Sequence, residues 1–152
     1  MHTRESLRIV LNASPLIVLV KLGILREVLN LFSEVEVPRG VLEEVERRRD
    51  EVYRELTKLI AEGKIHIEDI RKKLPRLGLG ESSAVFQALV KNKVVILDDK
   101  RARKLARELG LEVIGTLSIL KKLYEEGILK EAPNTLYRHL TEMGFYIDER
   151  VI

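Results

Sequence analysis

The chain has 152 residues, with 27 Lys and Arg against 24 Asp and Glu, and it contains no Cys or Trp. This length predicts one domain over residues 1–152, which should bury roughly 70% of its unfolded-chain surface. The absence of Cys excludes a disulfide framework, thiolate zinc sites, iron–sulfur ligation and cysteine nucleophiles. The three His residues are scattered without an H-E-x-x-H spacing, which argues against a metal site built on His.

No stretch has the length of a membrane span or the form of a secretion signal. The most apolar run, 16–20, is followed at once by Lys21 and then by Gly23, so it is far short of the ~20 residues that a span needs. We therefore expect a cytoplasmic protein without membrane contact. The charged content of 34% suggests a thermophile. The net charge of +3 is compatible with nucleic-acid binding and equally with an ordinary solvated surface.

Short apolar strands alternate with capped helices along the chain. Ser14 and Pro15, for example, predict the start of a helix that Gly23 ends. In chain order, the sequence predicts a strand at 7–11, helices at 14–23 and 24–32, a strand at 35–37, one long helix at 38–62, a strand at 65–67, a helix at 81–91, a strand at 94–97, a helix at 99–109, a strand at 112–114, and helices at 116–126 and 134–143.

This alternation, with continuous apolar strands, predicts an α/β sandwich around a mainly parallel sheet. In such folds ligands bind outside the carboxyl ends of the strands, at the point where the strand order reverses. The residues that follow the predicted strands are therefore the first candidates for a site. They are Asn12, Asp98, Asp99, Gly115 and Thr116.

Glu81 is an unusual acid because of its helical phase. The apolar residues of the helix at 81–91 centre within about 10° of Glu81, at about 100° per residue. A carboxylate that faces a core is costly unless it has a partner. The plain alternative is a first-turn acid that interacts favourably with the helix dipole or turns toward solvent.

Glu44 flanks the apolar face of the predicted long helix, whereas Glu43 points away from it. The functional interpretation places the Glu44 carboxylate at the site. The alternative is an ion pair with Arg48, four residues on, which would contribute only a few tenths of a kcal/mol.

Asp98 and Asp99 are adjacent acids at the carboxyl end of a buried strand. Asp99 precedes a Lys-rich helix and could simply be its N-cap, but one acid can cap while the other faces the site. Together with Glu44 and Glu81, these acids would meet at one edge of the sheet. Clustered carboxylates resist ionising together unless a cation lies between them. Oxygen ligands without His or Cys suit Mg²⁺ or Mn²⁺, ions that can activate water and stabilise charge on a phosphodiester.

The helix at 99–109 is strongly basic. Its cations form either a solvated face or a rim that contacts phosphates, for which the candidates are Lys100, Arg101 and Arg103. The few aromatic residues are not interleaved with basic ones, which argues against a module that stacks bases.

Four stretches have a distinctive order and spacing. They are VLNASPLIVLVKLG (10–23), VPRGVLEEV (37–45), LGLGESSAVFQAL (77–89) and VVILDDKRARKLARELGLEVIGTLSILKKLYEEGIL (94–129). Together with the carboxyl-terminal LTEMGFYIDERVI, they resemble the PIN (PilT N-terminus) domain family, and within it a sub-group of PIN-like proteins that begin with N-x-S-P-L-I.

The resemblance implies a three-layer α/β/α fold and a ribonuclease that depends on Mg²⁺ or Mn²⁺ held by acids. By position, the first family acid falls on Asn12, the second on Glu44, the third on Glu81, and the fourth on the Asp98–Asp99 pair. Ser14 and Thr116 are candidate accessory hydroxyls because they lie near strand ends. The resemblance also implies RNA as a partner, a small antitoxin protein that neutralises a toxin, and a homodimer.

Asn12 departs from the family pattern, because many PIN nucleases have Asp there. An amide oxygen can still bind a divalent ion, but one formal charge is missing, so metal affinity and water activation should both fall. Two hypotheses follow: a metal-dependent endoribonuclease, or a PIN-fold nucleic-acid-binding or scaffold module that has lost catalysis. The match over several motifs disfavours an unrelated α/β enzyme acting on a small molecule.

Overall fold

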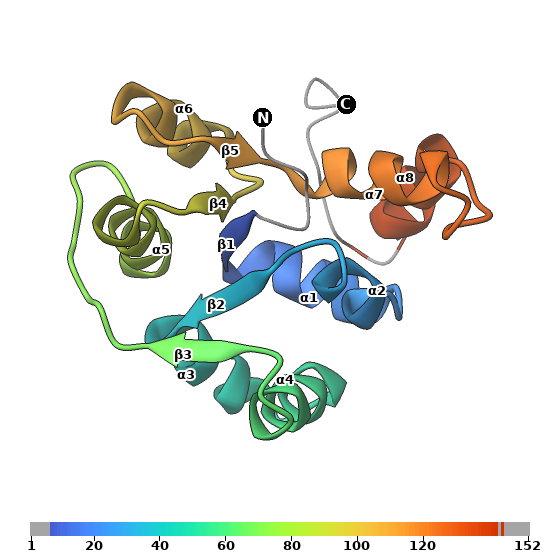
Figure 1. Ribbon diagram of the computed structural model, residues 1–152, viewed down its shortest axis with the longest axis horizontal. Coiled ribbons are helices and arrows are strands. Elements are labelled where there is room, and N and C mark those ends of the chain that lie inside the picture. Colours follow the sequence, from blue (N-terminus) through green and yellow to red (C-terminus); the bar gives the residue numbers. More distant parts are fainter. Residues whose placement is uncertain (1–6, 143, 145–152) are drawn as a thin grey trace.

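The computed structural model describes residues 7–142 and residue 144. Its centre is a sheet of five parallel strands in the order β3-β2-β1-β4-β5 (Figure 1). The strands are β1 (Arg8–Leu11), β2 (Glu34–Pro38), β3 (His66–Glu68), β4 (Val94–Ile96) and β5 (Val113–Ile114). The predicted α/β fold around a parallel sheet is confirmed. Most of the LTEMGFYIDERVI segment lies outside the described residues.

Helices connect successive strands and cover the sheet (Figure 1). Within the described residues they are α1 (Ala13–Lys21), α2 (Leu25–Leu29), α3 (Arg39–Arg48), α4 (Glu51–Ala61), α5 (Leu79–Lys91), α6 (Lys100–Glu108), α7 (Thr116–Glu125) and α8 (Pro133–Glu142). None of these helices has the length and apolar character that crossing a membrane would require.

The apolar core is split in two by the sheet, because successive side chains of a strand point to opposite faces. Ile9 and Leu11 of β1 pack with α1, α2, α3, α4, α7 and α8 on one face. Val10 between them packs with α5 and α6 on the other. The strands are therefore apolar on both faces, which is why the sequence shows them as continuous apolar runs. The result is a three-layer α/β/α arrangement.

The predicted long helix at 38–62 is wrong in one respect, because it is two helices. Arg49 adopts a left-handed conformation with φ 51° and ends α3. Asp50 then caps α4, and its Oδ1 accepts a hydrogen bond of 3.0 Å from the Val52 backbone N–H. The capping preference of Asp gave a local signal for this break. The apolar residues of both helices are nevertheless buried on the same side, as the helical phase predicted.

The strand order reverses between β1 and β4. From β1 the chain builds outward through β2 and β3 on one side, then returns to β4 and β5 on the other. Leu11 is paired with Ile96, and the Asn12 N–H donates to the Ile96 carbonyl oxygen at 3.3 Å. The residues after these two strands therefore lie side by side at the carboxyl edge of the sheet.

A buried ion cluster joins β2 to α5 and to the start of β4. Glu36 is 1% exposed, and Lys93 donates hydrogen bonds to Glu36 and, at 2.6 Å, to Glu34. Gln87 Nε2 donates to Glu36 at 2.7 Å, and Lys91 reaches Glu36 at 3.3 Å. Burial by itself would raise the pKa of Glu36, but the bonds from Lys93 and Gln87 outweigh it and lower that pKa. Glu36 is therefore charged and partnered inside the fold.

We expect Lys93→Met to lower the free energy of unfolding by about 3–5 kcal/mol, because it leaves the buried Glu36 charge without its main partner. Urea denaturation at pH 7 measures this loss. Lys91→Met is the matched control. Its side chain is 29% exposed, so we expect a loss of less than about 1 kcal/mol. Equal losses in the two variants would contradict the central place of Lys93 in the cluster.

Candidate active site

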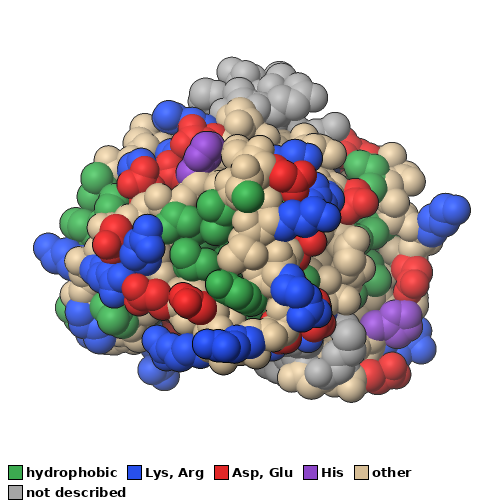
Figure 2. All heavy atoms as spheres, turned by 90° about the horizontal axis from the view of Figure 1, so that it is seen from below, with side chains coloured by type: hydrophobic (Ala, Val, Ile, Leu, Met, Phe, Trp, Pro, Cys, Tyr) green, Lys and Arg blue, Asp and Glu red, His purple; other side chains and the backbone are tan. Residues whose placement is uncertain are grey.

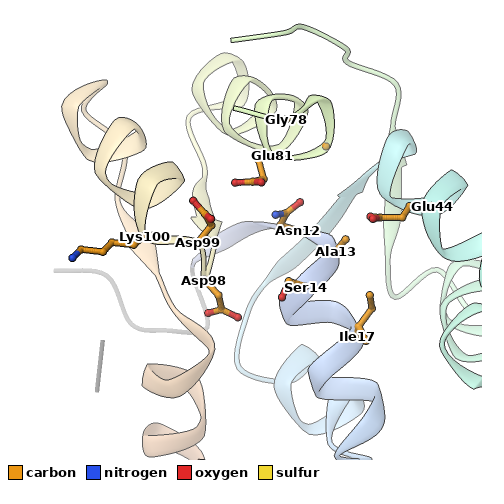
Figure 3. Close-up of a pocket in the computed structure, with 11 residues that line it drawn as sticks. Asn12, Ala13, Ser14, Ile17, Glu44, Gly78, Glu81, Asp98, Asp99 and Lys100 are labelled. Carbon is orange, nitrogen blue, oxygen red and sulfur yellow. The ribbon is translucent and has the colours of Figure 1, made fainter. Parts of the chain in front are cut away.

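A pocket of about 610 Å³ opens at the carboxyl edge of the sheet, beside the point where the strand order reverses. Its wall combines residues from the loops after β1 and β4 with residues from the first turns of α1, α5 and α6 and from α3 (Figure 3). The polar and charged side chains among them are Asn12, Ser14, Glu44, Glu81, Asp98, Asp99 and Lys100. The structure thus brings to one pocket the acids that the sequence singled out on separate elements.

Asn12 lies at the centre of this group and is 6% exposed. It is the N-cap residue of α1, but its side chain makes no capping hydrogen bond. The amide instead points toward Glu81 and Asp99 in Figure 3. Pro15 in the first turn of α1 has no N–H, so the helix start has one donor fewer to satisfy.

Glu81 and Asp99 face each other across the pocket (Figure 3). Glu81 stands in the first turn of α5, half-buried, as its helical phase predicted. Burial raises the pKa of Glu81, and the negative charge of Asp99 raises that pKa further. This pair is the part of the pocket where a cation would relieve repulsion most.

Asp99 combines the two interpretations that the sequence left open. Its Oδ1 accepts a hydrogen bond of 2.8 Å from the Ala102 N–H and so caps α6. The same carboxylate faces Glu81 in the pocket. Capping therefore fixes the orientation of this acid at the site.

Asp98 has a different environment. Its Oδ1 accepts from the Thr116 N–H at 2.7 Å and its Oδ2 accepts from the Thr116 hydroxyl at 2.6 Å. Burial raises the pKa of Asp98, while the bonds from Thr116 and the charge of Arg103 act to lower it. In Figure 3 the Asp98 side chain points away from Glu81. Asp98 thus ties the end of β4 to the start of α7.

Arg103 was expected among the nucleic-acid contacts, but it is only 8% exposed. Its guanidinium packs so closely on Gly115 that a Cβ there would lie 3.1 Å from Nη1. This packing leaves little of the side chain for a phosphate to reach. Of the two predicted accessory hydroxyls, Ser14 is exposed and lines the pocket, whereas Thr116 is fully buried against Asp98.

Glu44 projects from α3 into the pocket, and it is exposed (Figure 3). The neighbouring Glu43 is instead held in an ion pair by Arg71. The alternative partner for Glu44, Arg48, donates to Asp50 at 3.2 Å. Glu44 is thus the α3 acid that remains directed at the pocket.

A second pocket of about 670 Å³ adjoins the first, and the two share Gly78, Glu81, Asp99 and Lys100. Three more cations line this second pocket, namely Arg76, Arg101 and Lys104. Sequence reasoning did not single out Arg76, which lies in the loop before α5 with φ 70°. No local pattern marks that position, because its place beside α6 depends on how the loop folds.

Among the described residues, no three His, Asp or Glu side chains stand close enough together to hold a metal ion. The acids of the pocket are spread around its wall. A divalent ion there would therefore have at most two carboxylates as ligands, with other oxygen donors completing its coordination.

A family model for PIN domains, DUF3368, matches residues 8–152. The chain belongs to the PIN-domain family. Members of this family are generally nucleases that use divalent metals and bind nucleic acids. A search of curated proteins gives no significant match.

Two solved structures share the fold. One is a PilT N-terminus domain protein from the hyperthermophilic archaeon Sulfolobus solfataricus, with a TM-score of 0.54 and 16% identity over 83% of this chain and 97% of that one. The other is a domain of a protein of unknown function from Methanocaldococcus jannaschii, with a TM-score of 0.51 and 19% identity over 72% of this chain and 91% of that one. At these identities the likeness concerns the fold.

The raised pKa of Glu81 predicts how the metal-free protein responds to pH. Its folded-state pKa lies above the ordinary value of 4.5, so the unfolded state holds the charge more readily, and stability is lost as the pH rises through that raised pKa. We expect Glu81→Gln to be more stable than the wild type at pH 7 in EDTA, with the difference vanishing below about pH 4. Thermal melts across this range measure it, and a less stable variant at pH 7 would contradict the electrostatic account.

Proposed function

We propose that this PIN domain is an endoribonuclease that hydrolyses RNA phosphodiesters with Mg²⁺ or Mn²⁺. The observation that carries the proposal is the group formed by Asn12, Glu81 and Asp99 around one pocket. The repulsion between Glu81 and Asp99 gives this group a physical reason to bind a cation.

The donor set suits a hard divalent ion. Mg²⁺ keeps several of its waters in proteins and is commonly held by one or two carboxylates together with substrate phosphates. Glu81 and Asp99 supply two carboxylates, and the Asn12 amide oxygen is a third hard ligand. A site of this kind does not need three acids in one tight group.

The bound ion would activate water and stabilise the charge that develops on the phosphodiester. We assign Glu44 as the proton acceptor for the attacking water, since it is the remaining carboxylate directed at the pocket. Lys100, at the edge of the pocket, would bind a phosphate oxygen. Asp98 and Thr116 act as positioning residues, because they join the ends of β4 and β5 to each other.

We further propose a biological role for this nuclease, which the resemblance to the family supports. In this role the protein is the toxin of a toxin–antitoxin pair, a small antitoxin protein restrains it, and it acts as a homodimer in the cytoplasm. The second candidate function is a PIN-fold nucleic-acid-binding or scaffold module without catalysis. The amide of Asn12, where many family nucleases carry a carboxylate, favours that candidate.

Metal-dependent cleavage of a mixed RNA pool tests the catalytic proposal. We expect wild-type cleavage to require Mn²⁺ and to be lost in Glu81→Gln. Asn12→Asp should raise the cleavage rate, because the added charge neutralises the ion better, and the double variant Asn12→Asp/Glu81→Gln should lose the gain. Cleavage that persists in the double variant would point to a contaminating nuclease. No cleavage by the wild type or by Asn12→Asp would favour the binding module.

Thermal melts with added Mn²⁺ test the ligand assignment separately from activity. An ion that binds the native state stabilises it by about 2.7 kcal/mol at a hundredfold excess over the dissociation constant. We expect Mn²⁺ to raise the melting temperature of the wild type and of Asp98→Asn, and to have little effect on Asp99→Asn. The reverse pattern would make Asp98 the ligand.

A further inference from the structure

The second pocket has the opposite charge character to the first. Four acids and one cation line the acidic pocket, whereas four cations and two acids line its neighbour, the basic pocket. The two pockets share Lys100 and the Glu81–Asp99 pair. An acidic pocket and a basic pocket therefore lie side by side around the amino-terminal ends of α5 and α6.

The cations of the basic pocket are available for a ligand. Elsewhere many cations are paired with acids, as in the bonds of Arg26 to Glu62 at 2.7 Å and of Lys21 to Glu51 at 2.5 Å. On the face shown in Figure 2, acidic and basic side chains lie next to one another. Within the described residues, by contrast, no ion pair engages any of the four cations of the basic pocket. These cations are Arg76, Lys100, Arg101 and Lys104.

The position of Arg76 is fixed by the fold. Leu77 beside it is 4% exposed, and the Leu74 N–H donates to the Ser82 hydroxyl of α5 at 3.0 Å. The loop is thus anchored to α5 on both sides of Arg76. This anchoring holds Arg76 in the wall of the basic pocket, which the cations of α6 also line.

The backbone adds to the positive potential. The N-cap of α5 is Gly78, which has no side chain to satisfy the first N–H groups of that helix, and Gly78 lines both pockets. The amino-terminal end of a helix favours negative charge. An acidic pocket repels phosphates, so a nucleic-acid strand needs such a neighbouring region to hold it there.

We infer that the basic pocket holds a backbone phosphate of an RNA strand, next to the phosphate that occupies the acidic pocket. The substrate is then a strand with phosphates beyond the one that is cleaved, rather than a mononucleotide or a free phosphate. One part of this inference, that the strand continues from the basic pocket into the acidic pocket, rests on the proposed function. The phosphate contact itself is independent of catalysis.

Binding of a fluorescently labelled single-stranded oligouridylate in EDTA tests the inference without cleavage. Counterion release predicts that each phosphate contact contributes about 0.7 to the slope of log affinity against log salt concentration for a single strand. We expect the triple variant Arg76→Gln/Arg101→Gln/Lys104→Gln to reduce the size of that slope by about 0.7, because the basic pocket holds one backbone phosphate. Between 50 and 200 mM salt, the wild type should then lose about 2.6-fold more affinity than the variant.

The matched control is Arg107→Gln/Lys121→Gln/Lys122→Gln, which removes the same charge from exposed positions outside the basic pocket. We expect this control to keep the wild-type slope. Equal slopes for the two triple variants would overturn the inference. Inorganic phosphate and uridine monophosphate serve as competitors, and displacement of the strand by either at a concentration similar to that of the oligonucleotide would also overturn it.

The two proposals can fail separately. Loss of salt-dependent binding in the basic-pocket variant, with no cleavage by the wild type under Mn²⁺, would support the phosphate site and refute the ribonuclease. Cleavage by the wild type under Mn²⁺, together with unchanged salt-dependent binding in the basic-pocket variant, would support the ribonuclease and refute the phosphate site. A cleaving protein should show a higher KM and a nearly unchanged kcat in the triple variant, because the substituted side chains lie outside the acidic pocket.

Discussion

The parallel pairing of β1 with β4 is the constraint on which both pockets depend. It places Asn12 beside the Asp98–Asp99 pair, although more than eighty residues separate them along the chain. The helices that follow β1 and β4 then begin at the same edge of the sheet. Since α5 leads into β4, its first turn brings Glu81 to this edge as well. One strand contact thus assembles groups from three segments of the chain.

The two adjacent aspartates have different tasks because of their partners. Asp98 uses both oxygens to hold Thr116, which fixes the end of β5 against the end of β4. Asp99 uses one oxygen to cap α6 and still faces Glu81. By capping α6, Asp99 also fixes the position of the cations in the first two turns of that helix. One residue thus orients both its own carboxylate in the acidic pocket and the α6 cations that line the basic pocket.

The local patterns of the sequence were sufficient for most of the fold. The apolar strands, the helix start at Asp99 and the alternation of elements depend on neighbours within a few residues, which the sequence displays directly. The phase of Glu81 was likewise readable, because an α-helix repeats every 3.6 residues. The first helix was predicted to start at Ser14–Pro15, which is too late, because Asn12 is the N-cap of α1 and the helix begins at Ala13. The break at Arg49 and Asp50 was missed because the apolar phase continues through both helices and conceals the capping signal.

The sequence by itself thus determined the fold class, the family and the set of acids that line one pocket. Only the tertiary structure decided how those acids are used. It showed that Thr116, eighteen residues from Asp98, occupies that carboxylate, that Arg103 is buried against Gly115, and that Arg76 joins the basic pocket. The physical reason is that hydrogen-bond partners, burial and neighbouring charges are set by contacts between distant segments. Residue type and periodicity describe only local stretches of the chain, so they do not indicate which distant segments come into contact.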